Sequence, residues 1–177
     1  SPAVGMTSGM HWGGGIMPWG TPIDQRLDEA YSLIYTTAPL EEQVEVTGNP
    51  EAILYISSTA EVAYFRVKLI DVAPDGTSKL VRYGGLNATH RNGHETPEPL
   101  RPGEIYELTI EPFPTANRFK KGHRIRVDIS SSNFPRFDVN PNTGGDLGLE
   151  RRYQVAEQAI YHDPEHSSHL VLPIIER

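Results

Sequence analysis

Two stretches of the sequence hold residue types that could do chemistry. The first is the run Gly-Met-Thr-Ser-Gly at positions 5–9, which approaches the G-x-S-x-G pattern of serine hydrolases but places Thr7 where the nucleophilic serine belongs. That pattern works only on a sharp turn between a strand and a helix, which lifts the hydroxyl out of the sheet. Neither element is predicted around the run, so we expect no nucleophile there.

The second stretch is histidine-rich. Three histidines and two acidic residues lie between His162 and His169, and imidazole and carboxylate groups are ligands that zinc accepts. Pro164 interrupts any helix that would align His162 with His166 on one face. A polar turn between two strands is therefore the prediction, and a metal site is the alternative. Glycine-rich phosphate and dinucleotide motifs are missing, so no cofactor is predicted.

Composition narrows the classes of partner. The chain has 177 residues, with 16 Lys and Arg against 23 Asp and Glu, and a net charge of −7. This acidity disfavours nucleic acids and membrane surfaces as partners, since both attract basic proteins. Hydrophobic residues make up 37 % of the chain, enough for a core, but no run approaches the length of a membrane span. Cysteine is absent, which excludes disulfides and thiolate chemistry.

The elements that must position any site follow a period of two. Apolar residues alternate with polar ones around Leu54, Phe65, Leu108 and Val127, and residues 170–172 form a further apolar run. Such alternation predicts strands with one buried and one exposed face. With 16 Gly and 15 Pro marking turns between eight or nine strands and no long amphipathic helix, the prediction is an all-β, antiparallel two-sheet sandwich.

Two regions lack this pattern. Residues 1–22 are rich in glycine, contain Trp12 and Trp19, and show no periodicity, so we predict an extended arm, with a short helical turn at 24–30. Residues 133–157 carry no strand signal and predict a functional loop or a wrapping segment. The domain division is therefore an arm at 1–30 and a sandwich at 31–177. Because the chain starts Ser1-Pro2, we also expect further sequence upstream.

Several segments, taken in order, resemble one family. The resemblance is to the C-terminal domain of the X-Pro dipeptidyl-peptidase and cocaine-esterase (CocE/NonD) group of serine hydrolases, and it covers nearly the whole chain, in segments 22–26, 33–40, 44–48, 69–78, 113–119, 122–126, 130–137, 140–144, 161–163 and 169–173. One departure is Tyr64, which precedes Phe65 where members of the family often have Asp.

The resemblance implies a jelly-roll sandwich similar to galactose-binding domains. It also implies an upstream α/β-hydrolase domain that carries the catalytic Ser, Asp and His together with a helical cap. None of that triad maps onto this chain, and His162, His166 and His169 are not candidates for it. Likeness to a sugar-binding fold is not evidence of sugar binding.

The functional expectation is thus a non-catalytic domain of a serine hydrolase acting on ester or amide bonds. It would pack on the catalytic domain of the same polypeptide and shape the substrate cleft. The candidate contacts are apolar or flank apolar residues in segments without strands: Trp12, Trp19, Phe134, Arg136 and Phe137. Phe134 and Phe137 could equally cap the sandwich core.

Two alternatives have their own sequence features. Carbohydrate binding would use tyrosines exposed on a strand face, for which Tyr55, Tyr64 and Tyr83 are the candidates. Assembly into a homo-oligomer would use the faces or edges of the sandwich.

Overall fold

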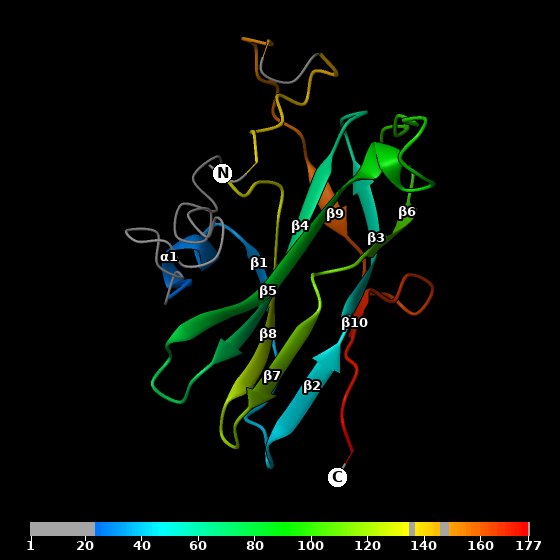
Figure 1. Cartoon of the computed structure of the whole chain (residues 1–177). Helices are drawn as coiled ribbons and strands as arrows, with labels where there is room; N and C mark the ends of the chain where they lie inside the picture. The colour runs from blue at the N-terminus through cyan, green and yellow to red at the C-terminus, as the bar shows by residue number, and fades with distance from the viewer. Residues whose placement is uncertain (1–23, 135–136, 146–148, 177) are drawn as a thin grey trace.

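Nearly all regular structure in this chain is β. The computed structural model describes residues 24–134, 137–145 and 149–176 (Figure 1). The helical elements are α1 (Arg26–Glu29) and the 3₁₀ turn η1 (Ala88–His90). The strands are β1 (Leu33–Thr36), β2 (Val44–Gly48), β3 (Glu51–Ser58), β4 (Tyr64–Val72), β5 (Ser78–Asn87), β6 (Tyr106–Ile110), β7 (Thr115–Phe119), β8 (Arg124–Ser130), β9 (Gln158–Ile160) and β10 (His169–Val171).

The strands form an antiparallel sandwich. One sheet has the order β1-β8-β4-β5, and the other has the order β10-β3-β6 with β9 also paired to β3. Strands β2 and β7 pair as a separate two-stranded ribbon. The predicted all-β sandwich is confirmed, whereas the closer likeness to galactose-binding domains stays a prediction. The short helical turn predicted at 24–30 is confirmed by α1.

The core lies between the two sheets. Phe65 and Val67 of β4 meet Leu54 of β3 and Leu108 of β6 in one buried cluster. The register explains why alternation predicted them: Leu54 pairs with Leu108, and Val67 pairs with Ile129, so that each pair shares the inner face. Each such side chain stabilises the fold by roughly 1.5–3 kcal/mol when it is fully buried.

Strand β4 departs from the prediction of one buried and one exposed face. Arg66 and Lys68 point away from the core, yet they are only 9 % and 1 % exposed. The half-exposed pattern is therefore wrong for this strand. The reason is that other segments cover its outer face: Asp28 of α1 forms a salt bridge with Lys68, and Phe137 of the loop after β8 lies over Arg66.

The described residues contain ten strands rather than eight or nine. The prediction named neither β7 nor β9, because β9 has only three residues and because β7 mixes polar and apolar residues without a long alternating run. Glycines mark turns between strands, as the sequence analysis expected: Gly76 and Gly122 have φ of 86° and 81°, a conformation that glycine adopts without steric cost. Within the described ranges, no helix has the length and apolar character needed to cross a membrane.

Candidate functional site

The longest connection in the sandwich, residues 131–157 between β8 and β9, holds the first candidate surface. Its described parts, 131–134, 137–145 and 149–157, contain no strand, as the sequence predicted. Asparagines hold it together: Asn140 donates from Nδ2 to the carbonyl of Val62 at 2.9 Å, and Asn142 donates to the carbonyl of Gln154 at 2.9 Å. Gln154 in turn donates its N–H to the carbonyl of Pro141. The two arms of the loop are thus joined to each other and to the sandwich.

This loop exposes large apolar side chains. Tyr153 is 69 % exposed and Val155 is 90 % exposed, and Phe134 and Leu149 are also exposed. Tyr153 and Val155 border an open groove of about 450 Å³, which is also lined by Val139, Asn140 and Asn142. Burying such side chains is favourable, so this loop is a candidate contact surface. We call Phe134, Leu149, Tyr153 and Val155 the loop patch.

The five residues predicted to contact another domain differ in where they lie and in how exposed they are. Trp12, Trp19 and Arg136 lie outside the described residues. Phe134 is 40 % exposed and belongs to the loop patch. Phe137 is half-buried and places its ring 3.9 Å from the Arg66 guanidinium carbon. The structure therefore separates the two phenylalanines: Phe137 covers the sandwich, whereas Phe134 is available for contact.

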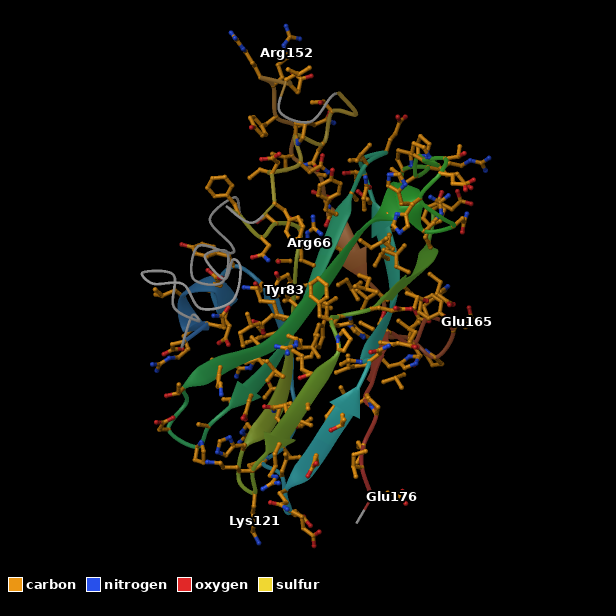
Figure 2. All side chains as sticks on the ribbon, in the orientation of Figure 1. Arg66, Tyr83, Lys121, Arg152, Glu165 and Glu176 are labelled. Carbon is orange, nitrogen blue, oxygen red and sulfur yellow. The ribbon has the colours of Figure 1, made fainter. Side chains whose placement is uncertain are left out.

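Arg66 of β4, labelled in Figure 2, packs against two aromatic rings and a glycine. Its guanidinium carbon lies 3.9 Å from the ring centre of Phe137 and 5.3 Å from that of Tyr64. Its Nε atom is buried and has no hydrogen-bond partner within the described part of the chain. Burial lowers the pKa of Arg66 from its usual value. A Cβ atom at Gly85 would overlap the Arg66 side chain, so Arg66 packs directly against this glycine and would have to move to admit a larger residue. Tyr64, which stands where members of the family often have Asp, is thus one of the two rings that pack against Arg66.

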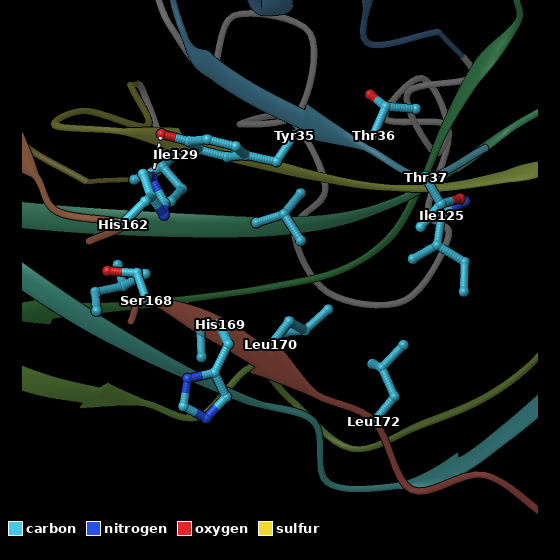
Figure 3. Close-up of a pocket in the computed structure, with 13 residues that line it drawn as sticks. Tyr35, Thr36, Thr37, Ile125, Ile129, His162, Ser168, His169, Leu170 and Leu172 are labelled. Carbon is cyan, nitrogen blue, oxygen red and sulfur yellow. Dashed lines mark hydrogen bonds between the residues drawn. The ribbon is translucent and has the colours of Figure 1, made fainter. Parts of the chain in front are cut away.

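A second apolar surface lies between β1 and β10, and the sequence analysis did not predict it. All four residues of β1 are exposed, and an open groove of about 410 Å³ runs between this strand and Leu170 and Leu172 (Figure 3). At its mouth the Tyr35 hydroxyl lies 2.8 Å from His162 Nε2, and burial raises the pKa of Tyr35. The run Leu33-Ile34-Tyr35 could have indicated this surface in the sequence, because consecutive apolar residues place apolar groups on both faces of a strand.

The histidine-rich stretch folds as the predicted turn. Its three imidazoles have separate partners: His162 contacts Tyr35, His166 Nδ1 lies 3.1 Å from the Asp163 carboxylate, and His169 Nδ1 lies 2.7 Å from the Ser167 carbonyl oxygen. Across the residues that the structure describes, no group of three or more His, Asp or Glu side chains is placed to hold a metal ion.

The tyrosines considered for carbohydrate binding are largely inaccessible. Tyr64 and Tyr83 are 7 % and 8 % exposed. Tyr55 is half-buried, lies opposite Glu107 on β6 and packs edge-on against His166 at 5.5 Å between ring centres. These three residues therefore do not form an exposed aromatic platform on a strand face. The near match to a nucleophile motif at 5–9 lies outside the described residues.

Comparison with known proteins shows that this chain is similar to members of one family. The model of the X-Pro dipeptidyl-peptidase C-terminal non-catalytic domain matches residues 4–171. Cocaine esterase of Rhodococcus sp. (strain MB1 Bresler) is 44 % identical over 160 residues, which cover 88 % of this chain and 28 % of the esterase.

Solved structures agree with the sequence match. An alpha-amino acid ester hydrolase superposes with a TM-score of 0.83 at 29 % identity, over 89 % of this chain and 28 % of the hydrolase. An aminopeptidase from the marine sediment archaeon Thaumarchaeota archaeon superposes with a TM-score of 0.84 at 28 % identity, over 92 % of this chain and 29 % of the aminopeptidase. The chain spans less than a third of these relatives. It belongs to the X-Pro dipeptidyl-peptidase and cocaine-esterase (CocE/NonD) family of serine hydrolases, in which it corresponds to the C-terminal, non-catalytic domain.

Proposed function

We propose that this chain packs on the α/β-hydrolase domain of the same polypeptide and forms one wall of its substrate cleft. The relatives support a large partner within the polypeptide, since the chain aligns with only 28 % of cocaine esterase and 28 % of the alpha-amino acid ester hydrolase. The reaction proposed for the whole protein is hydrolysis of an ester or amide bond, in keeping with relatives named as an esterase, an ester hydrolase and an aminopeptidase.

The loop patch is the observation that carries this proposal. Its side chains are exposed. Hydrogen bonds of Asn140 and Asn142 hold the loop to Val62 of the sandwich and to Gln154, which lies between Tyr153 and Val155. A rigidly held apolar surface loses little conformational entropy when it docks, which favours binding. Tyrosine is well suited to such a contact, because it offers a large apolar ring and a hydroxyl that can find a polar partner.

The role in catalysis is indirect. A wall of apolar side chains excludes water from the cleft and strengthens the electrostatic interactions inside it. It also limits which acyl or peptidyl groups fit, since a cleft discriminates by shape and apolar contact. In this proposal the catalytic triad resides in the hydrolase domain, and the chain contributes surface rather than reacting groups.

The test uses the full-length protein with Tyr153 and Val155 both replaced by serine. We expect a lower midpoint of thermal unfolding of the hydrolase domain and a fall in kcat/KM of about tenfold or more, the size typical of losing one strong interface contact. The matched control is Ile175→Ser, which removes another exposed apolar side chain. It lies near Glu176, at the opposite end of the sandwich from Arg152 of the loop (Figure 2). Equal behaviour of the double variant and the control would count against the loop patch as the docking surface.

A further inference from the structure

Helix α1 is attached to the sandwich through buried polar groups rather than through an apolar face. Gln25, Asp28 and Glu29 are all buried, while Leu27 on the same turn is 74 % exposed. Asp28 receives a hydrogen bond from Lys68 Nζ of β4 at 2.8 Å, and Glu29 receives one from Arg126 Nη1 of β8 at 2.6 Å. Gln25 and Glu29 also bind Ser78 at the start of β5. One short helix is thus bonded to three strands of the same sheet.

Asp128 lies in the middle of this cluster. It faces Lys68 across the pair of strands β4 and β8 and is 1 % exposed. Both of its carboxylate oxygens are buried, and neither has a hydrogen-bond partner among the residues that the structure describes. Its surroundings hold charged groups from three elements: Asp28 and Glu29 of α1, Lys68 of β4 and Arg126 of β8. Strand β1 places uncharged Ile34 opposite Asp128, and the exposed Arg26 of α1 is paired with Asp24.

The charges in the cluster balance only when Asp128 carries a proton. Asp28 and Glu29 are then matched by Lys68 and Arg126 in two close ion pairs. An ionised Asp128 would add a third negative charge in a buried site, where an unpaired charge is costly. Burial, followed by repulsion from Glu29, raises the pKa of Asp128 to about 7 in spite of Lys68 and Arg126.

We propose that α1 is a proton-controlled clasp, closed over the outer face of the sheet while Asp128 is protonated and released when Asp128 ionises. Release separates Asp28 and Glu29 from the sheet, which lets water reach Asp128 and lets the two cations pair with it. The pH of the surroundings thus sets how often α1 is open.

Hydrogen exchange of the α1 amides measures the opening directly in the 177-residue chain. The amides of Asp28, Glu29 and Tyr31 are bonded within the turn, and they exchange only when it opens. After correction for the intrinsic rate, linkage to the Asp128 proton predicts an opening constant about a hundredfold larger at pH 8 than at pH 5. In Asp128→Asn, whose amide cannot ionise, the opening constant should be nearly the same at both pH values.

The matched control is Glu111→Gln, which neutralises an exposed carboxylate on the β6–β7 connection and should keep the pH dependence of the wild type. The proposal is overturned if Asp128→Asn keeps that dependence too. A second measurement does not depend on any variant: the ¹³C chemical shift of the Asp128 carboxyl carbon should titrate near neutrality. A midpoint below pH 5 would equally overturn the proposal.

Discussion

The guanidinium of Arg66 lies 3.9 Å above the ring centre of Phe137, joining the central strand of one sheet to the loop that follows β8. This stack explains how a loop without strands keeps a defined position on the sandwich. It also explains how an arginine is tolerated at 9 % exposure in the middle of a sheet, since the aromatic face offers the cation an electrostatic partner.

Replacing Phe137 with alanine should therefore destabilise the domain. The loss combines buried ring surface with the cation–π contact, and we expect the free energy of unfolding to fall by about 2–4 kcal/mol. Chemical denaturation with urea measures it. The control is Phe134→Ala, which removes an exposed ring and should cost below about 1 kcal/mol in the isolated chain. Similar losses for both variants would argue against the Arg66 stack as the anchor of the loop.

Lys68→Met should be among the most damaging substitutions in the chain. It keeps the length of the side chain but leaves the Asp28 carboxylate buried without its cation, which costs about 3–5 kcal/mol. Urea denaturation at neutral pH is again the measurement. Lys79→Met on the exposed face of β5 is the control and should change stability by less than about 0.5 kcal/mol. A small effect of Lys68→Met would show that the buried ion pair is dispensable.

Asp128→Asn should stabilise the domain in neutral and alkaline solution. A folded pKa of about 7 exceeds the ordinary value of 3.8, so the folded state retains a proton that the unfolded state has already lost. The free energy of unfolding of the wild type therefore decreases as the pH rises from about 4 to about 7 and is constant above that.

The amide variant avoids this loss, and its advantage should approach roughly 4 kcal/mol at pH 8 and vanish near pH 4. Urea midpoints of wild type and variant across this range measure the difference. A constant difference at all pH values would contradict a raised pKa for Asp128.

The arm is tested in the full-length protein with Trp12→Ala and Trp19→Ala. If the tryptophans contact the hydrolase domain, each truncation should lower interdomain stability by about 2 kcal/mol or more, since buried indoles dominate many interfaces. Calorimetry resolves the transitions of the two domains. Unchanged transitions in both variants would remove the two tryptophans from the interface.

The sequence by itself determined the strands of the core and the family. Alternation at Leu54, Phe65 and Leu108 is a local property, because a strand turns every second side chain to the same face whatever lies beyond it. Turn residues such as Gly76 are equally local, and the order of the family segments along the chain can be read without any structure.

Only the tertiary structure decided which polar residues are buried and which apolar residues are exposed. Lys68 and Asp28 are 40 positions apart, and Glu29 and Arg126 are 97 apart. No local sequence pattern could therefore predict that these residues pair. Likewise Phe134 and Phe137 are the same residue type three positions apart, yet one is exposed and the other covers Arg66. Burial of a charge depends on partners brought together by the whole fold, and that is why these sites had to be seen in three dimensions.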